Sequence, residues 1–235
     1  RAAFVVLGGI AFVIGVIVVR GMPRYVPARN DTTDRARGFW RDPSLPALAA
    51  FGASAVLIAV AQFASFTYIR PYLEVSAAIG GEWAAMLLFA YGMAGMVGVV
   101  VAGFLADRFP RSALVAILVS FTVAFAVLTV AAGALAAVIG ALLVWGFAIG
   151  ALFPLLQTTL MRIATERTRT LASAGIVVLF NVGIAVGPWL GGIAGGETAP
   201  TVTTAVSAAA MGVAALFGVV GVMLARARLA VSAPR

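Results

Sequence analysis

Residues 113–130, ALVAILVSFTVAFAVLTV, contain no charged side chain and no regular alternation of apolar and polar residues. A helix needs roughly 20 apolar residues to cross about 30 Å of hydrocarbon, whereas a membrane barrel strand alternates with a period of two. The stretch therefore predicts a transmembrane α-helix. The whole chain has a matching composition, because 63% of its 235 residues are hydrophobic and only 10% are charged. A soluble domain with this balance could not cover its surface with polar groups.

Six more stretches pass the same test of length and polarity. The seven expected spans are residues 2–19, 45–69, 83–105, 113–130, 135–156, 171–193 and 203–224. The predicted fold class is an all-α integral membrane protein with one leading helix and a six-helix unit, in contact with the lipid bilayer. The chain begins with Arg1 and enters an apolar helix at once, so we expect it to be a fragment of a longer protein.

The basic residues predict an orientation in the membrane. The net charge is +8, but the arginines are dispersed among loops, so we expect no nucleic-acid partner. With seven spans, 14 of the 16 basic residues fall on one side, and only Arg1 and Arg70 fall on the other. Cytoplasmic loops keep positive charge, so in the cell (inner) membrane the amino end should lie outside and the carboxyl tail in the cytoplasm. We interpret Arg70 as an anchor at the outer interface.

Several chemistries are excluded by residue types that the chain lacks. It contains no Cys and no His, so we expect no disulfide, thiolate or imidazole metal site, and no cofactor. The spans offer no nucleophile with a base and no carboxylate pair, so an intramembrane enzyme is not expected. A seven-helix retinal receptor is the alternative that the span count suggests, but its Schiff base needs a lysine, and the chain has none.

The longest polar segment divides the chain unevenly. Residues 20–46 carry six arginines together with Pro23, Pro27 and Pro43, which is linker composition. One helix, a linker and six helices are the pattern of a twelve-span transporter built from two six-helix halves. We therefore predict the last helix of the first half at 1–19, a cytoplasmic linker at 20–46, the second half at 47–226 and a cytoplasmic tail at 227–235.

The loop after the third span carries the sequence GFLADRFPR, residues 103–111. It is similar to the signature G-x-L-x-D-R-x-x-R of the major facilitator superfamily, although Pro110 stands where the family usually has Gly. The resemblance implies that Asp107 faces the positive end of a helix in the opposite half and so controls the outward-open state. Gly103 would let helices approach closely, and Arg108 and Arg111 would remain in the basic layer. The alternative is a plain polar helix end.

A glycine-rich helix gives a second resemblance. GPWLGG at residues 187–192 resembles the G-P-x-x-G-G signature of the antiporter branch, as the counterpart of that helix in the other half. The residues expected to form one small-residue face are Gly183, Gly187, Gly191 and Gly195. We also expect broken helices, with hinges at Gly150 with Pro154 and at Gly187 with Pro188. The alternative is ordinary packing with a proline kink.

QFASFTYIRPYL at residues 62–73 resembles the seventh helix of sugar-efflux and drug-efflux permeases in the first drug:proton antiporter branch. This resemblance implies a secondary transporter that exports an amphipathic drug-like or sugar-like solute by alternating access. Protons would be the coupling partner, and the coupling carboxylate would lie in the missing N-terminal half. Two alternatives remain: the helices belong to the first half, or the fragment alone transports nothing.

Polar and aromatic side chains within the spans are the candidates for a substrate cavity, because polar groups in lipid normally face the bundle interior. The candidates are Gln62, Thr67, Tyr68, Tyr91, Trp145, Gln157 and Asn181. Phe153 is a further aromatic residue that could stack against cargo. The alternative for each residue is interhelical hydrogen bonding or core packing.

Overall fold

The computed structural model describes residues 42–110 and 112–231, together with six single positions between residues 9 and 20. The chain divides into two units, residues 1–36 and 37–235. The elements of the second unit are α3 (Leu45–Thr67), α4 (Ile69–Pro71), the π-helical turn η1 (Tyr72–Ser76), α5 (Gly81–Arg108), α6 (Ala113–Val130), α7 (Leu135–Ile163), α8 (Arg169–Ala194) and α9 (Pro200–Val231). The first expected span, residues 2–19, lies mostly outside the described residues.

The prediction of an all-α membrane protein is confirmed for the described part of the chain, where six helices are long and apolar enough to cross a membrane. Helix α6 has the predicted bounds. Helices α5, α7 and α9 are longer than predicted at their carboxyl ends. The additional turns contain Arg108, Arg162 and Arg228. A helix end with arginine is compatible with the membrane surface, because the long side chain can keep its charge in water.

The second span ends earlier than predicted. Helix α3 stops at Thr67, and Tyr68 leaves the helical region with φ −107° and ψ 19°. Pro71 has no N–H and so cannot donate to the carbonyl of Thr67 four residues earlier, which accounts for the break. The chain then continues through α4 and η1 before it turns back into α5.

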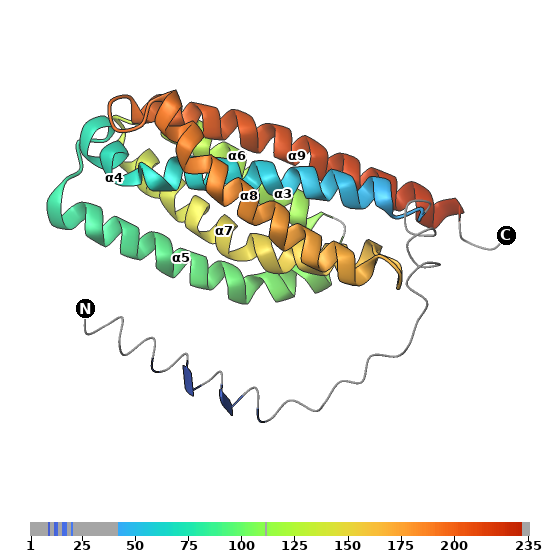
Figure 1. The fold of residues 1–235 in the computed structure, drawn as a ribbon. Coiled ribbons are helices and arrows are strands. Elements are labelled where there is room, and N and C mark those ends of the chain that lie inside the picture. Colours follow the sequence, from blue (N-terminus) through green and yellow to red (C-terminus); the bar gives the residue numbers. More distant parts are fainter. Residues whose placement is uncertain are drawn as a thin grey trace. The chain divides into compact units, whose positions relative to one another are not determined.

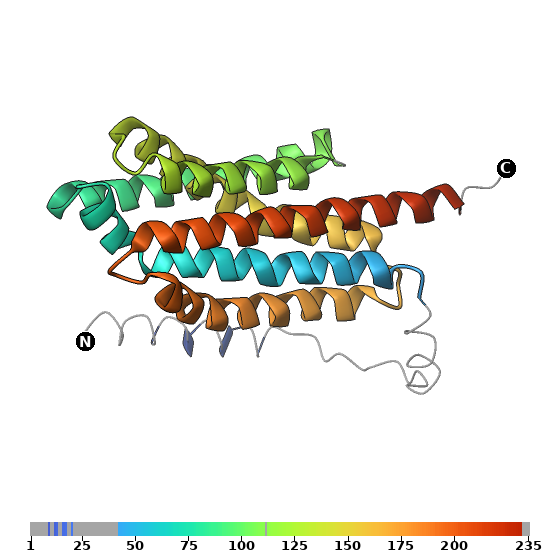
Figure 2. The same ribbon diagram turned by 90° about the horizontal axis from the view of Figure 1, so that it is seen from above.

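The helices form a continuous series of neighbours. Helix α3 lies between α8 and α9, as Figure 2 shows for the cyan, orange and red ribbons. Helix α6 joins α9 to α7, and α5 covers the other side of α7 (Figure 1). Helices α5 and α8 stand at the two ends of this series, with one extensive neighbour each. They are consequently the least buried spans.

The core lies where α3, α6, α7 and α9 meet. Its largest fully buried side chains include Phe51, Phe121, Phe125 and Trp145. The Ser54 hydroxyl donates to the carbonyl of Ala214 at 2.8 Å, which ties α3 to α9. Such interhelical hydrogen bonds and close packing replace the hydrophobic driving force that lipid does not supply.

Candidate functional site

Three predicted cavity residues meet inside the bundle, each from a different helix. The indole Nε1 of Trp145 on α7 donates to Oε1 of Gln62 on α3 at 2.6 Å. The Gln62 amide Nε2 donates in turn to the Tyr91 hydroxyl on α5 at 3.1 Å. Trp145 is fully buried, Gln62 is 5% exposed and Tyr91 is half-buried. We call Gln62, Tyr91 and Trp145 the amide cluster.

Aromatic rings surround the amide cluster. The Tyr91 and Trp145 rings meet edge to face, with centroids 5.2 Å apart. Phe125 lies 4.8 Å from Trp145 on the core side. Phe66 lies 5.6 Å from Tyr91 and is 39% exposed, so it forms the accessible wall. Sequence reasoning did not select Phe66, although it follows Gln62 by four residues and therefore shares its helix face.

Among the described residues, no hydrogen bond or ring contact joins the remaining cavity candidates to the amide cluster. Thr67 and Asn181 are exposed and hydrogen-bond to carbonyls of their own helices, at 2.7 and 2.8 Å. The Tyr68 hydroxyl donates to the carbonyl of Pro188 at 3.3 Å. Gln157 is half-buried. Phe153 meets Phe180 edge to face at 5.8 Å, at the contact of α7 with α8.

Three of the four glycines expected on one face of α8 contact the backbone of α3. A Cβ added at Gly183, Gly187 or Gly191 would lie 2.6, 2.9 or 2.8 Å from a carbonyl oxygen of α3. The expectation was wrong for Gly195, where an added Cβ would fall on the carbonyl of Ala199. Gly195 follows the last residue of α8 and lies in the turn into α9, where an added Cβ would also lie 3.3 Å from the Thr203 hydroxyl.

A second glycine contact joins α5 to α7. A Cβ at Gly150 would fall on the carbonyl oxygen of Gly95, and one at Gly98 would fall on that of Phe147. A Cβ added at Gly146 would likewise fall on the carbonyl oxygen of Tyr91. Sequence reasoning singled out only Gly150. The four-residue spacing of Gly146 and Gly150 was the available signal, the same one that was used for α8.

The expected helix breaks at Pro154 and Pro188 are not present. Helix α7 continues through Pro154 and α8 through Pro188. Each ring removes one backbone donor, but helix turns on both sides remain paired, so the interruption stays local. The Thr158 hydroxyl also binds the carbonyl of Pro154 at 2.8 Å. A hinge role for Gly150 with Pro154 and for Gly187 with Pro188 remains a prediction.

The loop signature lies at the end of α5. Asp107 is highly exposed, and one of its carboxylate oxygens lies 3.8 Å from Nη2 of Arg162 on α7. The Arg108 guanidinium lies 5.8 Å from the centre of the Phe109 ring. Within the described bundle a Cβ at Gly103 would meet no atom within 4 Å, so a close helix approach there remains a prediction. Arg111 lies outside the described residues.

Comparison with known proteins identifies the family of the chain. The model of the Major Facilitator Superfamily matches residues 1–188 and, in a second overlapping match, residues 57–234. The chain belongs to this superfamily. Chloramphenicol efflux pumps from two strains of Mycobacterium tuberculosis are each 32% identical to it over 226 residues, which cover 93% of the chain and 54% of each pump. A "Probable sugar efflux transporter" of Mannheimia succiniciproducens is 27% identical over 192 residues, 81% of the chain and 47% of that protein. The chain thus spans about half the length of these curated relatives.

This major facilitator chain also holds a buried polar cluster, two of whose residues, Asp42 and Ser44, sequence reasoning assigned to the linker. Asp42 is 8% exposed and accepts hydrogen bonds from the Ser44 hydroxyl at 2.6 Å and the Thr165 hydroxyl at 2.7 Å. Ser44 also contacts the Thr168 hydroxyl at 3.0 Å. We call Asp42, Ser44, Thr165 and Thr168 the loop knot, because it fastens the start of α3 to the loop between α7 and α8. Nearby, Arg228 of α9 donates to the carbonyl of Ile163 at 2.9 Å.

The charge state of Asp42 follows from this geometry. Burial alone would raise the pKa of Asp42, but hydrogen bonds from Ser44 and Thr165 outweigh burial and lower the pKa below 3.8, with a smaller effect from Arg228. The folded state therefore favours the carboxylate. Its contribution to stability is present above pH 3.8 and is lost as the pH falls through the lowered pKa of the folded state.

We expect Asp42→Ala to lower the unfolding free energy of this superfamily member by about 1–3 kcal/mol, because Ser44 and Thr165 lose a buried charged acceptor. Thermal unfolding in detergent would measure the loss, and the variant should also lose sensitivity to acid below pH 3.8. Glu166→Ala is the matched control, since Glu166 is an exposed carboxylate in the same loop. Equal stability of the two variants would show that the Asp42 carboxylate of the loop knot contributes nothing to the free energy of unfolding.

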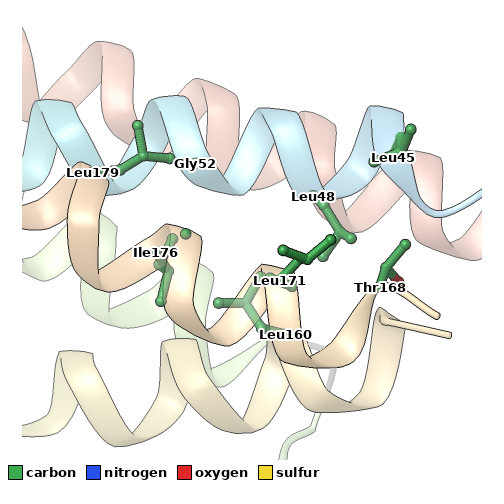
Figure 3. Close-up of a pocket in the computed structure, with 10 residues that line it drawn as sticks. Leu45, Leu48, Gly52, Leu160, Thr168, Leu171, Ile176 and Leu179 are labelled. Carbon is green, nitrogen blue, oxygen red and sulfur yellow. The ribbon is translucent and has the colours of Figure 1, made fainter. Parts of the chain in front are cut away.

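An apolar pocket of about 160 Å³ lies beside the loop knot, between α3, α7 and α8. Figure 3 shows Leu48, Leu171, Ile176 and Thr168 among the residues that line it. Gly52 lines it on α3, where an added Cβ would lie 2.8 Å from Cδ1 of Leu179. The pocket is separate from the amide cluster, with which it shares no lining residue.

Proposed function

We propose that this chain is the second six-helix half of an exporter that moves a small uncharged solute by alternating access. The amide cluster carries the proposal, because it combines hydrogen-bonding groups with the exposed ring of Phe66. An orienting polar group beside aromatic walls is the usual composition of a small-molecule site. The efflux pumps among its relatives support export as the direction.

We propose that a first half of similar size completes the cavity. Helices α5 and α8 expose large apolar side chains, among them Phe89, Met96 and Val178. In the repeat architecture of major facilitator transporters, the substrate lies between two halves that rock against each other. Residues 47–226 would form one of these halves, and the coupling carboxylate for protons would belong to the other.

Chloramphenicol accumulation tests the proposed function. Cells that produce the full-length protein should accumulate less of the drug than cells that carry an empty vector, and dissipating the proton gradient should abolish the difference. A difference that survives loss of the gradient would contradict proton coupling. No difference for chloramphenicol or for a panel of neutral solutes and sugars would contradict export.

We propose that the arginine-rich end of the bundle, which includes Arg108, Arg162 and Arg228, faces the cytoplasm of the cell membrane. The chain contains no Cys, so a single cysteine introduced at either end reports its own location. The Glu166→Cys variant should not react with a thiol reagent that is added outside the cell and cannot cross the membrane. The Glu197→Cys variant should react with the same reagent. The reverse pattern would contradict this orientation.

We propose that Asp107 is the gating carboxylate of the transporter. Arg162, 3.8 Å away, would hold the Asp107 side chain in position. Asp107→Asn keeps the size of the side chain and removes its charge, so the efflux rate should fall by roughly fivefold to tenfold, the lower end of the range that typical coupling energies give. Glu166→Gln is the control, because it neutralises an exposed carboxylate at the same end of the bundle. An unchanged rate in Asp107→Asn would remove the gating role.

A further inference from the structure

The direction of the hydrogen bonds in the amide cluster is fixed by chemistry. An indole N–H can only donate, so the atom of Gln62 that lies 2.6 Å from Trp145 Nε1 must be the amide oxygen. This assignment orients the whole amide and turns its NH₂ group toward Tyr91, 3.1 Å away. An amide NH₂ can only donate, so the Tyr91 oxygen is the acceptor.

The proton of the Tyr91 hydroxyl is therefore available to a group other than Gln62. No acceptor for it is found among residues 42–110 and 112–231. The two other tyrosines in these ranges differ in this respect, because Tyr68 donates to the carbonyl of Pro188 and Tyr72 donates to that of Leu128. Tyr91 is half-buried beside the exposed Phe66, so its proton is held where a solute could accept it.

We infer that Tyr91 is a specificity-determining hydrogen-bond donor for a neutral solute that carries an acceptor oxygen next to a flat apolar group. The acceptor would bind the Tyr91 proton, and the flat group would lie against Phe66. The amide cluster contains no ionised group that could compensate a desolvated ion, so charged solutes are disfavoured. The inference rests on the proposed function and names the solute class that this site accepts.

Transport kinetics of Tyr91→Phe in the full-length protein test the inference, with chloramphenicol as the probe, because this neutral molecule carries nitro and carbonyl oxygens. The variant keeps the ring and loses the donor. We expect KM for efflux to rise about threefold to tenfold, as for the loss of one neutral hydrogen bond, with little change in the maximal rate. Tyr72→Phe is the matched control, since it makes the same chemical change away from the amide cluster and should leave KM unchanged.

The outcomes separate the inference from the proposed function. Lack of efflux by the unmodified protein would contradict the proposed function. Normal efflux with an unchanged KM in Tyr91→Phe would overturn the inference alone, as would a fall in the maximal rate at constant KM, which indicates a structural role. Tetraphenylphosphonium, an aromatic cation, should not compete with chloramphenicol. Competition by this cation would overturn the preference for neutral solutes.

Discussion

Replacing Gly150 by Val is expected to remove most of the folded protein from the membrane. A Cβ at this position would fall on the carbonyl oxygen of Gly95. Backbone atoms cannot move aside as a flexible side chain can, so α5 and α7 would have to separate along their whole contact. We expect a loss of more than about 3 kcal/mol, at or above the upper end of the usual cost of overpacking. Thermal unfolding in detergent and the amount of protein in the membrane would measure it.

Gly140→Val is the control for this prediction. It introduces the same residue into the same helix, but a Cβ at Gly140 would meet no atom within 4 Å. The two variants share the effect of Val on helix propensity, so their difference isolates the clash. If Gly150→Val were as stable as Gly140→Val, the contact between α5 and α7 would be looser than the structure shows.

Trp145→Ala should be the second severe change. The side chain is fully buried, contacts the rings of Tyr91 and Phe125, and donates to Gln62. Its removal leaves a cavity whose walls lose their dispersion contacts, and it also frees the Gln62 oxygen. Large aromatic truncations of this kind cost about 3–5 kcal/mol. We therefore expect a lower unfolding temperature in detergent and loss of transport, because Gln62 no longer orients Tyr91.

Trp83→Ala is the matched control for the Trp145 variant. Trp83 is 69% exposed near the start of α5, so the same truncation there opens no cavity. A small change in unfolding temperature is expected for this variant. An equally small change for Trp145→Ala would mean that the aromatic rings repack without cost, which would contradict the central place of Trp145 in the core.

The sequence was sufficient to predict the helices, because each span must satisfy its own backbone hydrogen bonds within lipid. Helix α6 shows this best, since its predicted and observed bounds coincide. The end of α3 was less predictable. Residues 68 and 69 are apolar or aromatic, and the hydrocarbon length test does not detect the donor that Pro71 removes.

The sites were predicted in part, and the misses have physical causes. Gln62, Tyr91 and Trp145 were each predicted as polar or aromatic residues within spans, but their meeting depends on helix rotation, which composition does not specify. Asp42 was assigned to the linker because residues 20–46 are rich in proline, arginine and aspartate. Its burial depends on the Thr165 hydroxyl, more than a hundred residues away, and its neighbour Ser44 contacts the Thr168 hydroxyl.

The open space around some glycines has a consequence for how mutational data on this protein should be interpreted. Gly92 and Gly103 on α5 and Gly175 on α8 have no neighbour within 4 Å of an added Cβ, whereas Gly98 and Gly183 have several. In a saturation scan, intolerance at Gly98 or Gly183 would report on the integrity of these six helices. Intolerance at Gly103 would report on something beyond them, so a comparison of the two groups would map the surface that another part of the transporter covers.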